Sequence, residues 1–123
     1  MAFDLIAFNR RACIDHCDEL LFDVATLAGV PGPTLERLWE KFYDGPRFTA
    51  DESKALASEL RALHQVIVAN PEIIQLAWEA RPEAYRKNYA RPSSGALEAK
   101  CMELVEVCED GAHSGEGLRS LSD

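Results

Sequence analysis

The sequence predicts an all-α protein, a compact antiparallel bundle of about five to six helices. Apolar residues recur at steps of three and four in nearly every segment, and almost none alternate with polar residues. Glycine and proline clusters divide the chain into pieces of helical length joined by short loops. The chain has 123 residues, of which 47% are hydrophobic and 28% charged, so one domain can bury a core. We therefore expect a single helical domain over residues 1–110.

The first predicted helix ends at Ala28, where Gly29 and the following Val-Pro-Gly-Pro stop it. One alternative stays open for residues 1–8, which could form a short N-terminal strand before a helix that begins after Asn9, a favourable N-cap. The apolar face of the predicted helix consists of Phe3, Ile6, Ala7, Cys13, Cys17, Leu20, Leu21, Val24, Leu27 and Ala28.

The middle of the chain predicts three helices from their boundary residues. Pro33 begins a short helix with a heavy aromatic load, which Asp44-Gly45-Pro46 ends. Thr49 and Glu52 have the capping-box spacing, so the next helix begins there. The Asn70-Pro71 pair ends that helix and starts the following one, which Arg81-Pro82 ends.

The C-terminal part predicts a short helix, a long helix and a tail. The short helix lies between Pro82 and Pro92, and either Ser93 or Ser94 caps the long helix, which Gly111 ends. Residues 111–123 are polar and rich in glycine, so we expect a C-terminal tail that is either flexible or held only by two leucines. These leucines are Leu118 and Leu121.

Charge limits the class of partner. Twenty-one acidic residues against 13 basic ones give a net charge of −8. Such a chain is repelled by nucleic acid and attracted to a protein with a basic surface. One segment is an exception, because residues 81–91 hold four cations and two tyrosines. This segment is either a contact for a nucleotide or RNA, or it lies against the acidic residues of the chain itself, which we favour.

Neither a membrane segment nor an enzyme motif is visible. No apolar stretch approaches the length that crosses a bilayer, and no basic region precedes an apolar run at the N-terminus, so we expect a cytoplasmic protein. His64 and His113 lack a nucleophile partner, and the glycines after residue 110 lack the context of a phosphate loop. We therefore predict that the protein is not an enzyme and has no cofactor.

The cysteines leave a metal-binding alternative open. Cys13, His16 and Cys17 have helical spacing that places their side chains on one side, and Cys101 and Cys108 could complete a zinc site if the ends of the chain pack together. Both pairs also fit apolar helix faces, where a free cysteine behaves as a small hydrophobic residue. Buried free thiols are therefore the leading prediction, and a zinc-binding regulatory protein is the alternative.

The acidic faces give the leading functional hypothesis. Like charges at helical spacing weaken a helix, and either a partner that they bind explains that cost or the acidic surface only keeps the protein soluble. Tyr43, beside the short helix, either closes the edge of the core, which is the leading interpretation, or lies exposed and anchors the partner. The predicted partner-binding residues are Asp15, Asp18, Glu19 and Asp23 on the first helix, Tyr43, and Glu103 and Glu106 on the last helix, where Glu98, Glu109 and Asp110 add further charge.

No motif assigns the chain to a family. In size, acidity, helical pattern and lack of a catalytic signature, it resembles small inhibitors from bacterial and phage conflict systems, such as immunity proteins and anti-CRISPR proteins. This resemblance is one of type and rests on no particular residue. It implies an inhibitor that binds a basic nucleic-acid-binding or catalytic surface of a partner protein and occludes it. The long first helix is also compatible with a homodimer.

Overall fold

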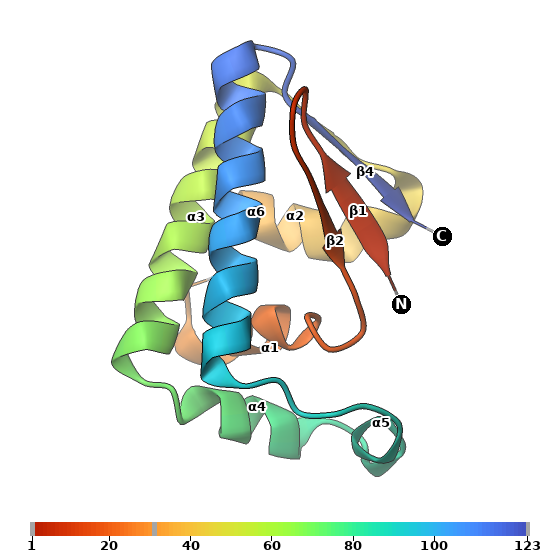
Figure 1. The fold of residues 1–123 in the computed structure, drawn as a ribbon, viewed down its shortest axis with the longest axis vertical. Coiled ribbons are helices and arrows are strands. Elements are labelled where there is room, and N and C mark those ends of the chain that lie inside the picture. Colours follow the sequence, from red (N-terminus) through yellow and green to blue (C-terminus); the bar gives the residue numbers. More distant parts are fainter. Residues whose placement is uncertain (1, 31, 123) are drawn as a thin grey trace.

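A four-stranded antiparallel sheet packs against six α-helices in the computed structural model, which describes residues 2–30 and 32–122 (Figure 1). The chain is 63% helical and 12% strand. The prediction of an all-α bundle is therefore wrong, and the protein has a mixed α/β fold.

The sheet joins both ends of the chain. Its strands are β1 (Phe3–Ile6), β2 (Arg11–Ile14), β3 (Arg47–Phe48) and β4 (Leu118–Ser122), in the order β2-β1-β4-β3. Each neighbouring pair is antiparallel. The two termini therefore lie side by side at the same end of the sheet (Figure 1).

The N-terminal segment forms a β-hairpin where the sequence predicted a helix. Phe3 and Leu5 are buried while Asp4 and Ile6 are half-exposed, which is the period of two of a strand with one face covered. The amide of Ala7 donates to the carbonyl of Arg10 at 2.8 Å and closes the turn. The open alternative of an N-terminal strand is confirmed for β1, but the segment after Asn9 is the second strand, not a helix. Four-residue strands are too short for their alternation to exclude a helical period.

The predicted tail is part of the sheet. The last helix runs on to Ser114, so the expected boundary at residue 110 lies inside it, and β4 pairs with both β1 and β3. Gly117 has a φ of 72°, and a Cβ there would lie 2.0 Å from the carbonyl oxygen of Phe48. A Cβ on Gly111 would lie 2.7 Å from the carbonyl oxygen of Gly117. Gly117 therefore allows the chain before β4 to approach β3, and Gly111 allows α6 to approach that same segment.

The helices agree better with the predicted boundaries. Gly29 ends the first with a φ of 67°, the capping box of Thr49 and Glu52 is formed, and the Ser93 hydroxyl accepts from the Ala96 amide at 3.0 Å. The helices are α1 (Leu20–Ala28), α2 (Pro33–Lys41), α3 (Ala50–Ala69), α4 (Ile73–Ala80), α5 (Glu83–Asn88) and α6 (Ser94–Ser114), with a 3-10 turn, η1 (Phe42–Asp44), after α2. None of the helices in the described ranges is long and apolar enough to cross a membrane.

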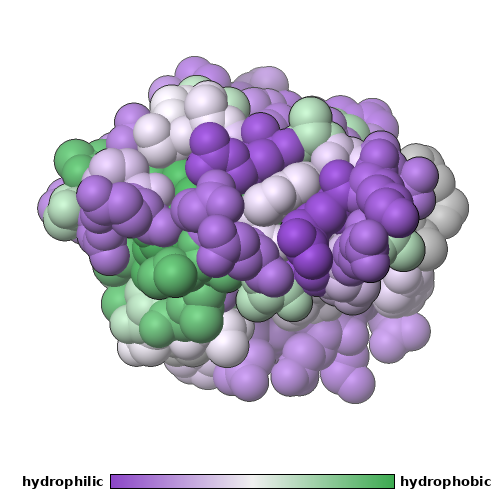
Figure 2. Space-filling view, turned by 90° about the horizontal axis from the view of Figure 1, so that it is seen from below, coloured by the Kyte–Doolittle hydropathy of each residue, from purple (hydrophilic) through white to green (hydrophobic). Residues whose placement is uncertain are grey.

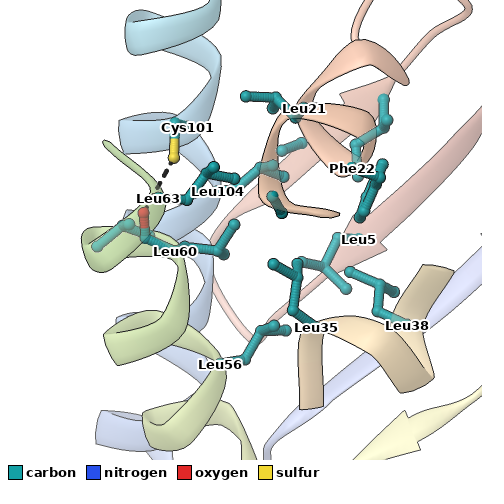
Figure 3. Close-up of a cluster of buried hydrophobic side chains, with 14 of the residues drawn as sticks. Leu5, Leu21, Phe22, Leu35, Leu38, Leu56, Leu60, Leu63, Cys101 and Leu104 are labelled. Atoms are coloured by element: carbon teal, nitrogen blue, oxygen red, sulfur yellow. Dashed lines mark hydrogen bonds between the residues drawn. The ribbon is translucent and has the colours of Figure 1, made fainter. Parts of the chain in front are cut away.

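The core lies between the sheet and the helices. The long helices α3 and α6 pack side by side, α2 lies behind the sheet, and α4 and α5 lie below (Figure 1). Buried side chains from the sheet and from four helices meet in one cluster (Figure 3). Those labelled in Figure 3 are Leu5, Leu21, Phe22, Leu35, Leu38, Leu56, Leu60, Leu63, Cys101 and Leu104.

The other face of the sheet is open to solvent. Its outward residues are exposed or half-exposed, and two cationic side chains cover carbonyls at its edges. The Lys100 ammonium donates to the carbonyl of Cys13 in β2 at 2.8 Å, and the Arg37 guanidinium donates to the carbonyl of Arg47 in β3. Such contacts hinder the addition of another strand at either edge. The outward residues are Asp4, Ile6, Arg11, Cys13, Arg47, Arg119 and Leu121.

Candidate functional site

Two of the predicted acidic residues, Asp15 and Asp18, lie in the turn before α1 and stabilise it. The Asp15 carboxylate accepts from the amides of Cys17 and Asp18 at 3.0 and 3.1 Å, and the Asp18 carboxylate accepts from the Asp15 amide at 3.1 Å. The Lys100 ammonium lies 3.7 Å from Asp18. These carboxylates supply acceptors for the backbone amides of the turn that leads into α1.

The environment of this turn moves the two pKa values in opposite directions. Burial raises the pKa of Asp15, but hydrogen bonds from Asp18 and Cys17 outweigh it and hold the pKa below its usual value. For Asp18, burial dominates and raises the pKa, although the Asp15 amide and Lys100 act against it. Both side chains therefore belong to a local polar network.

The other two acidic residues of this segment are also engaged within the chain. Glu19 is buried at 8% exposure. The Asp23 carboxylate accepts from Nε of Arg81, whose guanidinium lies 4.5 Å from the centroid of the Tyr85 ring. The acidic residues predicted as one face over residues 15–23 thus have partners within the chain, although Asp15 is exposed, and Asp23 also lines a surface hollow.

The basic segment 81–91 packs against this acidic turn. The Tyr85 hydroxyl donates to the carbonyl of His16, and the Tyr89 ring stacks on the His16 ring with 4.8 Å between centroids. Burial raises the pKa of Tyr85 to about 12. The short helix α5 buries no residue of its own, so these aromatic contacts hold it in place.

The acidic residues of α6 are exposed but lie in ion pairs. Glu103 is 3.2 Å from Lys100, and Glu106 is 3.0 Å from Arg10 in the β1–β2 turn. Exposed pairs of this kind contribute little to stability, so a partner could replace them at small cost. Glu103 and Glu106 therefore remain accessible to a basic surface.

The cysteines do not converge with His16. Cys101 and Cys108 are buried, and the Cys101 thiol donates to the carbonyl of Leu60 at 3.1 Å (Figure 3). Burial raises the pKa of both thiols to about 12. The prediction of buried thiols is therefore confirmed for these two, but it is wrong for Cys13, which is exposed on the open face of the sheet. Within residues 2–30 and 32–122, no three His, Cys, Asp or Glu side chains are grouped to hold a metal ion.

Sequence reasoning missed the acidic residues that flank Trp39. Glu36 and Glu40 are exposed on α2, and neither is in an ion pair within the described ranges. With the half-buried Trp39 between them, they line a hollow of about 180 Å³ between α1 and α2. The signal in the sequence was a pair of glutamates four residues apart on either side of a tryptophan, a spacing that costs helix stability.

Tyr43 is linked to Trp39 of this hollow through the ring of Phe42. It is 58% exposed on η1, and its ring centroid is 4.0 Å from that of Phe42. Phe42 stacks on Trp39 at 5.4 Å, so one aromatic cluster joins the exposed tyrosine to the tryptophan of the hollow. We call Glu36, Trp39, Glu40 and Tyr43 the α2 surface.

An apolar region continues from the α2 surface around α1. Thr26 lines the hollow beside Trp39 and also a second hollow of about 410 Å³, which Asp23, Leu27 and Ala77 line as well. Figure 2 shows hydrophobic side chains gathered on the underside of the molecule, where α4 lies. The large exposed apolar residues from α1, the end of α3 and α4 are Leu27, Val68 and Leu76.

No family model, no curated protein and no solved structure matches the chain.

Proposed function

We propose that the chain is a small protein-binding inhibitor that occludes a basic nucleic-acid-binding or catalytic surface of a partner protein. The observation that supports this best is the α2 surface, where two carboxylates that pair with no cation in residues 2–30 and 32–122 flank a tryptophan, and Phe42 links this tryptophan to an exposed tyrosine. An interface anchor of this kind combines aromatic area with charges that attract a basic partner.

The chemistry of the α2 surface fits lysine or arginine side chains of the partner. The aliphatic stem of either residue can lie in the apolar hollow against Trp39, and its cationic head can reach Glu36 or Glu40 at the rim. Glu103 and Glu106, in exposed pairs on α6, add negative charge that speeds association with a basic surface.

The protein would act in the cytoplasm by covering the surface of its partner, and it would not itself catalyse a reaction. All four cysteines are free thiols in the structure, and reducing compartments keep thiols in this state. The inhibitor would thus act at a stoichiometric ratio with its target.

The test is capture of partners from lysate of the native host by the tagged protein, at low and high salt, with mass spectrometry. We expect a basic, stoichiometric partner whose own activity falls as this protein is added. The variant Glu36→Gln/Glu40→Gln should weaken binding at least about tenfold, because it removes both charges of the α2 surface.

The matched control is Glu72→Gln/Glu79→Gln, which changes the net charge equally at two exposed sites outside the α2 surface and outside the acidic face of α6. Replacing Tyr43 with a photo-crosslinking residue should in addition link the partner directly. Equal loss of binding in the two double variants would show that net charge alone matters, and it would contradict the α2 surface as the site.

A further inference from the structure

The open face of the sheet holds a row of arginines that the proposed function does not use. The strand registers place Arg11 of β2, Ile6 of β1, Arg119 of β4 and Arg47 of β3 next to one another across the sheet. The alternation along each strand turns these residues away from the core, and all three arginines are exposed. In a chain with a net charge of −8, such a row is a local reversal of sign.

Only part of this positive charge is neutralised by the chain. Arg11 forms an ion pair with Asp4. Arg47 and Arg119 form no ion pair with any residue that the structure describes, although they lie directly opposite each other across the β3–β4 pair. Like charges in directly opposed positions are unfavourable, so an anion that binds both guanidinium groups would stabilise the sheet.

A hollow lies beside these two arginines. Its volume is about 330 Å³, and Arg47, Arg119, Ile6 and Phe8 are among the residues that line it. Phe8 is 69% exposed at the turn between β1 and β2, so its ring is free to stack on a flat ligand. Glu116 also lines the hollow but forms no ion pair with either arginine in the described part of the chain.

We propose that this hollow binds a nucleotide, with the base stacked on Phe8 and the phosphate held by Arg47 and Arg119. Guanidinium groups hold phosphate oxygens through paired hydrogen bonds, and two of them side by side can hold one phosphate from both sides. The aromatic ring and the cations line the same hollow, as a ligand with a base and a phosphate requires.

The surroundings favour a single nucleotide over a strand of nucleic acid. Along the row, the next cation is Arg11, and Asp4 already neutralises it. On its other side, Phe8 lines a second hollow with Asp110, whose carboxylate would repel further phosphates. One phosphate-bearing unit therefore fits the local charge, and a chain of phosphates does not.

The test is a titration of the isotopically labelled protein with adenosine 5′-monophosphate, uridine 5′-monophosphate, adenosine and inorganic phosphate, followed by NMR. We expect saturable shifts at the amides of residues 6–8, 47 and 117–119, with the nucleotides binding more tightly than adenosine or phosphate alone. Absence of saturable shifts up to about 10 mM nucleotide would overturn the proposal.

Three variants locate the ligand. Arg119→Ser should weaken nucleotide binding at least about tenfold, while Arg86→Ser, an equal change of charge on α5, should leave it nearly unchanged. Phe8→Leu should weaken nucleotide binding but leave the binding of inorganic phosphate as it is. Circular dichroism should show a folded protein for all three. Equal losses for the two arginine variants would overturn the site.

Other polyanions provide the competing outcomes. A single-stranded oligonucleotide whose affinity rises steadily with each added nucleotide would overturn the single-nucleotide site in favour of a strand-binding face. A polyglutamate peptide that binds more tightly than either nucleotide would overturn it in favour of an acidic protein segment.

Discussion

Two acidic segments, residues 15–23 and 36–40, differ in whether their carboxylates have partners within the chain. The carboxylates of Asp15, Asp18 and Asp23 accept hydrogen bonds from backbone amides or lie against cations, which come from α6 and from the residue that follows α4. The carboxylates of Glu36 and Glu40 lie at the rim of a hollow and meet no cation in the described ranges. Spacing at three to four residues therefore reveals acidic residues that share a side of a helix, but it does not reveal which of them the fold has already paired.

The largest expected difference between the two segments concerns Asp23. Asp23→Ala should lower the free energy of unfolding by about 2 kcal/mol, because it leaves the guanidinium of Arg81 without its counter-ion. The Arg81 side chain is only 18% exposed, and its Nη2 atom is already buried without a hydrogen-bond partner. Urea unfolding followed by circular dichroism measures the change.

The control for Asp23 is Glu83→Ala, which breaks the fully surface-exposed pair with Lys87, 73% exposed on both sides. This change should cost less than about 0.5 kcal/mol. If Asp23→Ala cost no more than its control, then residues 15–23 would be a free acidic face after all.

The second prediction concerns the turn before α1. Asp15→Ala should cost about 1 kcal/mol, because the amides of Cys17 and Asp18 lose their acceptor. Asp15→Asn keeps an acceptor oxygen and should cost much less. Comparing the urea midpoints of the two variants separates the contribution of the acceptor oxygen from that of the negative charge. An equal loss in both variants would show that the charge itself matters.

The third prediction uses the pH dependence of this turn. The lowered pKa of Asp15 contributes stability above its unfolded pKa of about 3.9, and this contribution is lost as pH falls through the folded value. The raised pKa of Asp18 acts in the opposite sense, since its ionised form disfavours the folded state. Lys100 lowers the pKa of both carboxyls.

Lys100→Met should therefore raise the pKa of Asp15 and Asp18 together and reduce stability at pH 7 more than at pH 3. NMR titration of the carboxyl carbons measures the pKa values, and urea unfolding at the two pH values measures the stability. Unchanged titration curves would remove Lys100 from the network.

The smallest effect is expected on α2. Glu36→Gln/Glu40→Gln should change the free energy of unfolding by less than about 0.5 kcal/mol, in the stabilising direction, because it removes a like-charge pair from a helix. A marked loss of stability would show that these glutamates have a structural partner, and it would weaken the case for a binding surface there.

The sequence predicted the helical half of the fold better than the sheet. The Thr49 capping box, the Ser93 cap and the glycine that ends α1 are local signals, and the structure confirms each of them. The sheet depends on contacts between the two ends of the chain, and β4 in particular is a strand only because β1 and β3 flank it. The local sequence of residues 118–122 does not predict this pairing.

The candidate site also combines features visible in the local sequence with features that depend on tertiary packing. The sequence placed Tyr43 beside a short helix and favoured a role at the edge of the core, whereas the structure exposes it at 58%. The glutamates on either side of Trp39 share a hollow with residues of α1, so their role depends on how α1 and α2 pack. The opposed arginines Arg47 and Arg119 are 72 positions apart and meet only through strand register.

The amino-acid sequence by itself determined the capping box of α3, the serine cap of α6, the glycine that ends α1 and the net acidic charge, since each depends on neighbours within a turn or two or on composition. The tertiary structure alone decided that the ends of the chain form a sheet, which acidic residues are neutralised and which cations remain unpaired. The physical reason is that strand pairing and ion pairing join groups distant in sequence, and their energies depend on a geometry that no local pattern specifies.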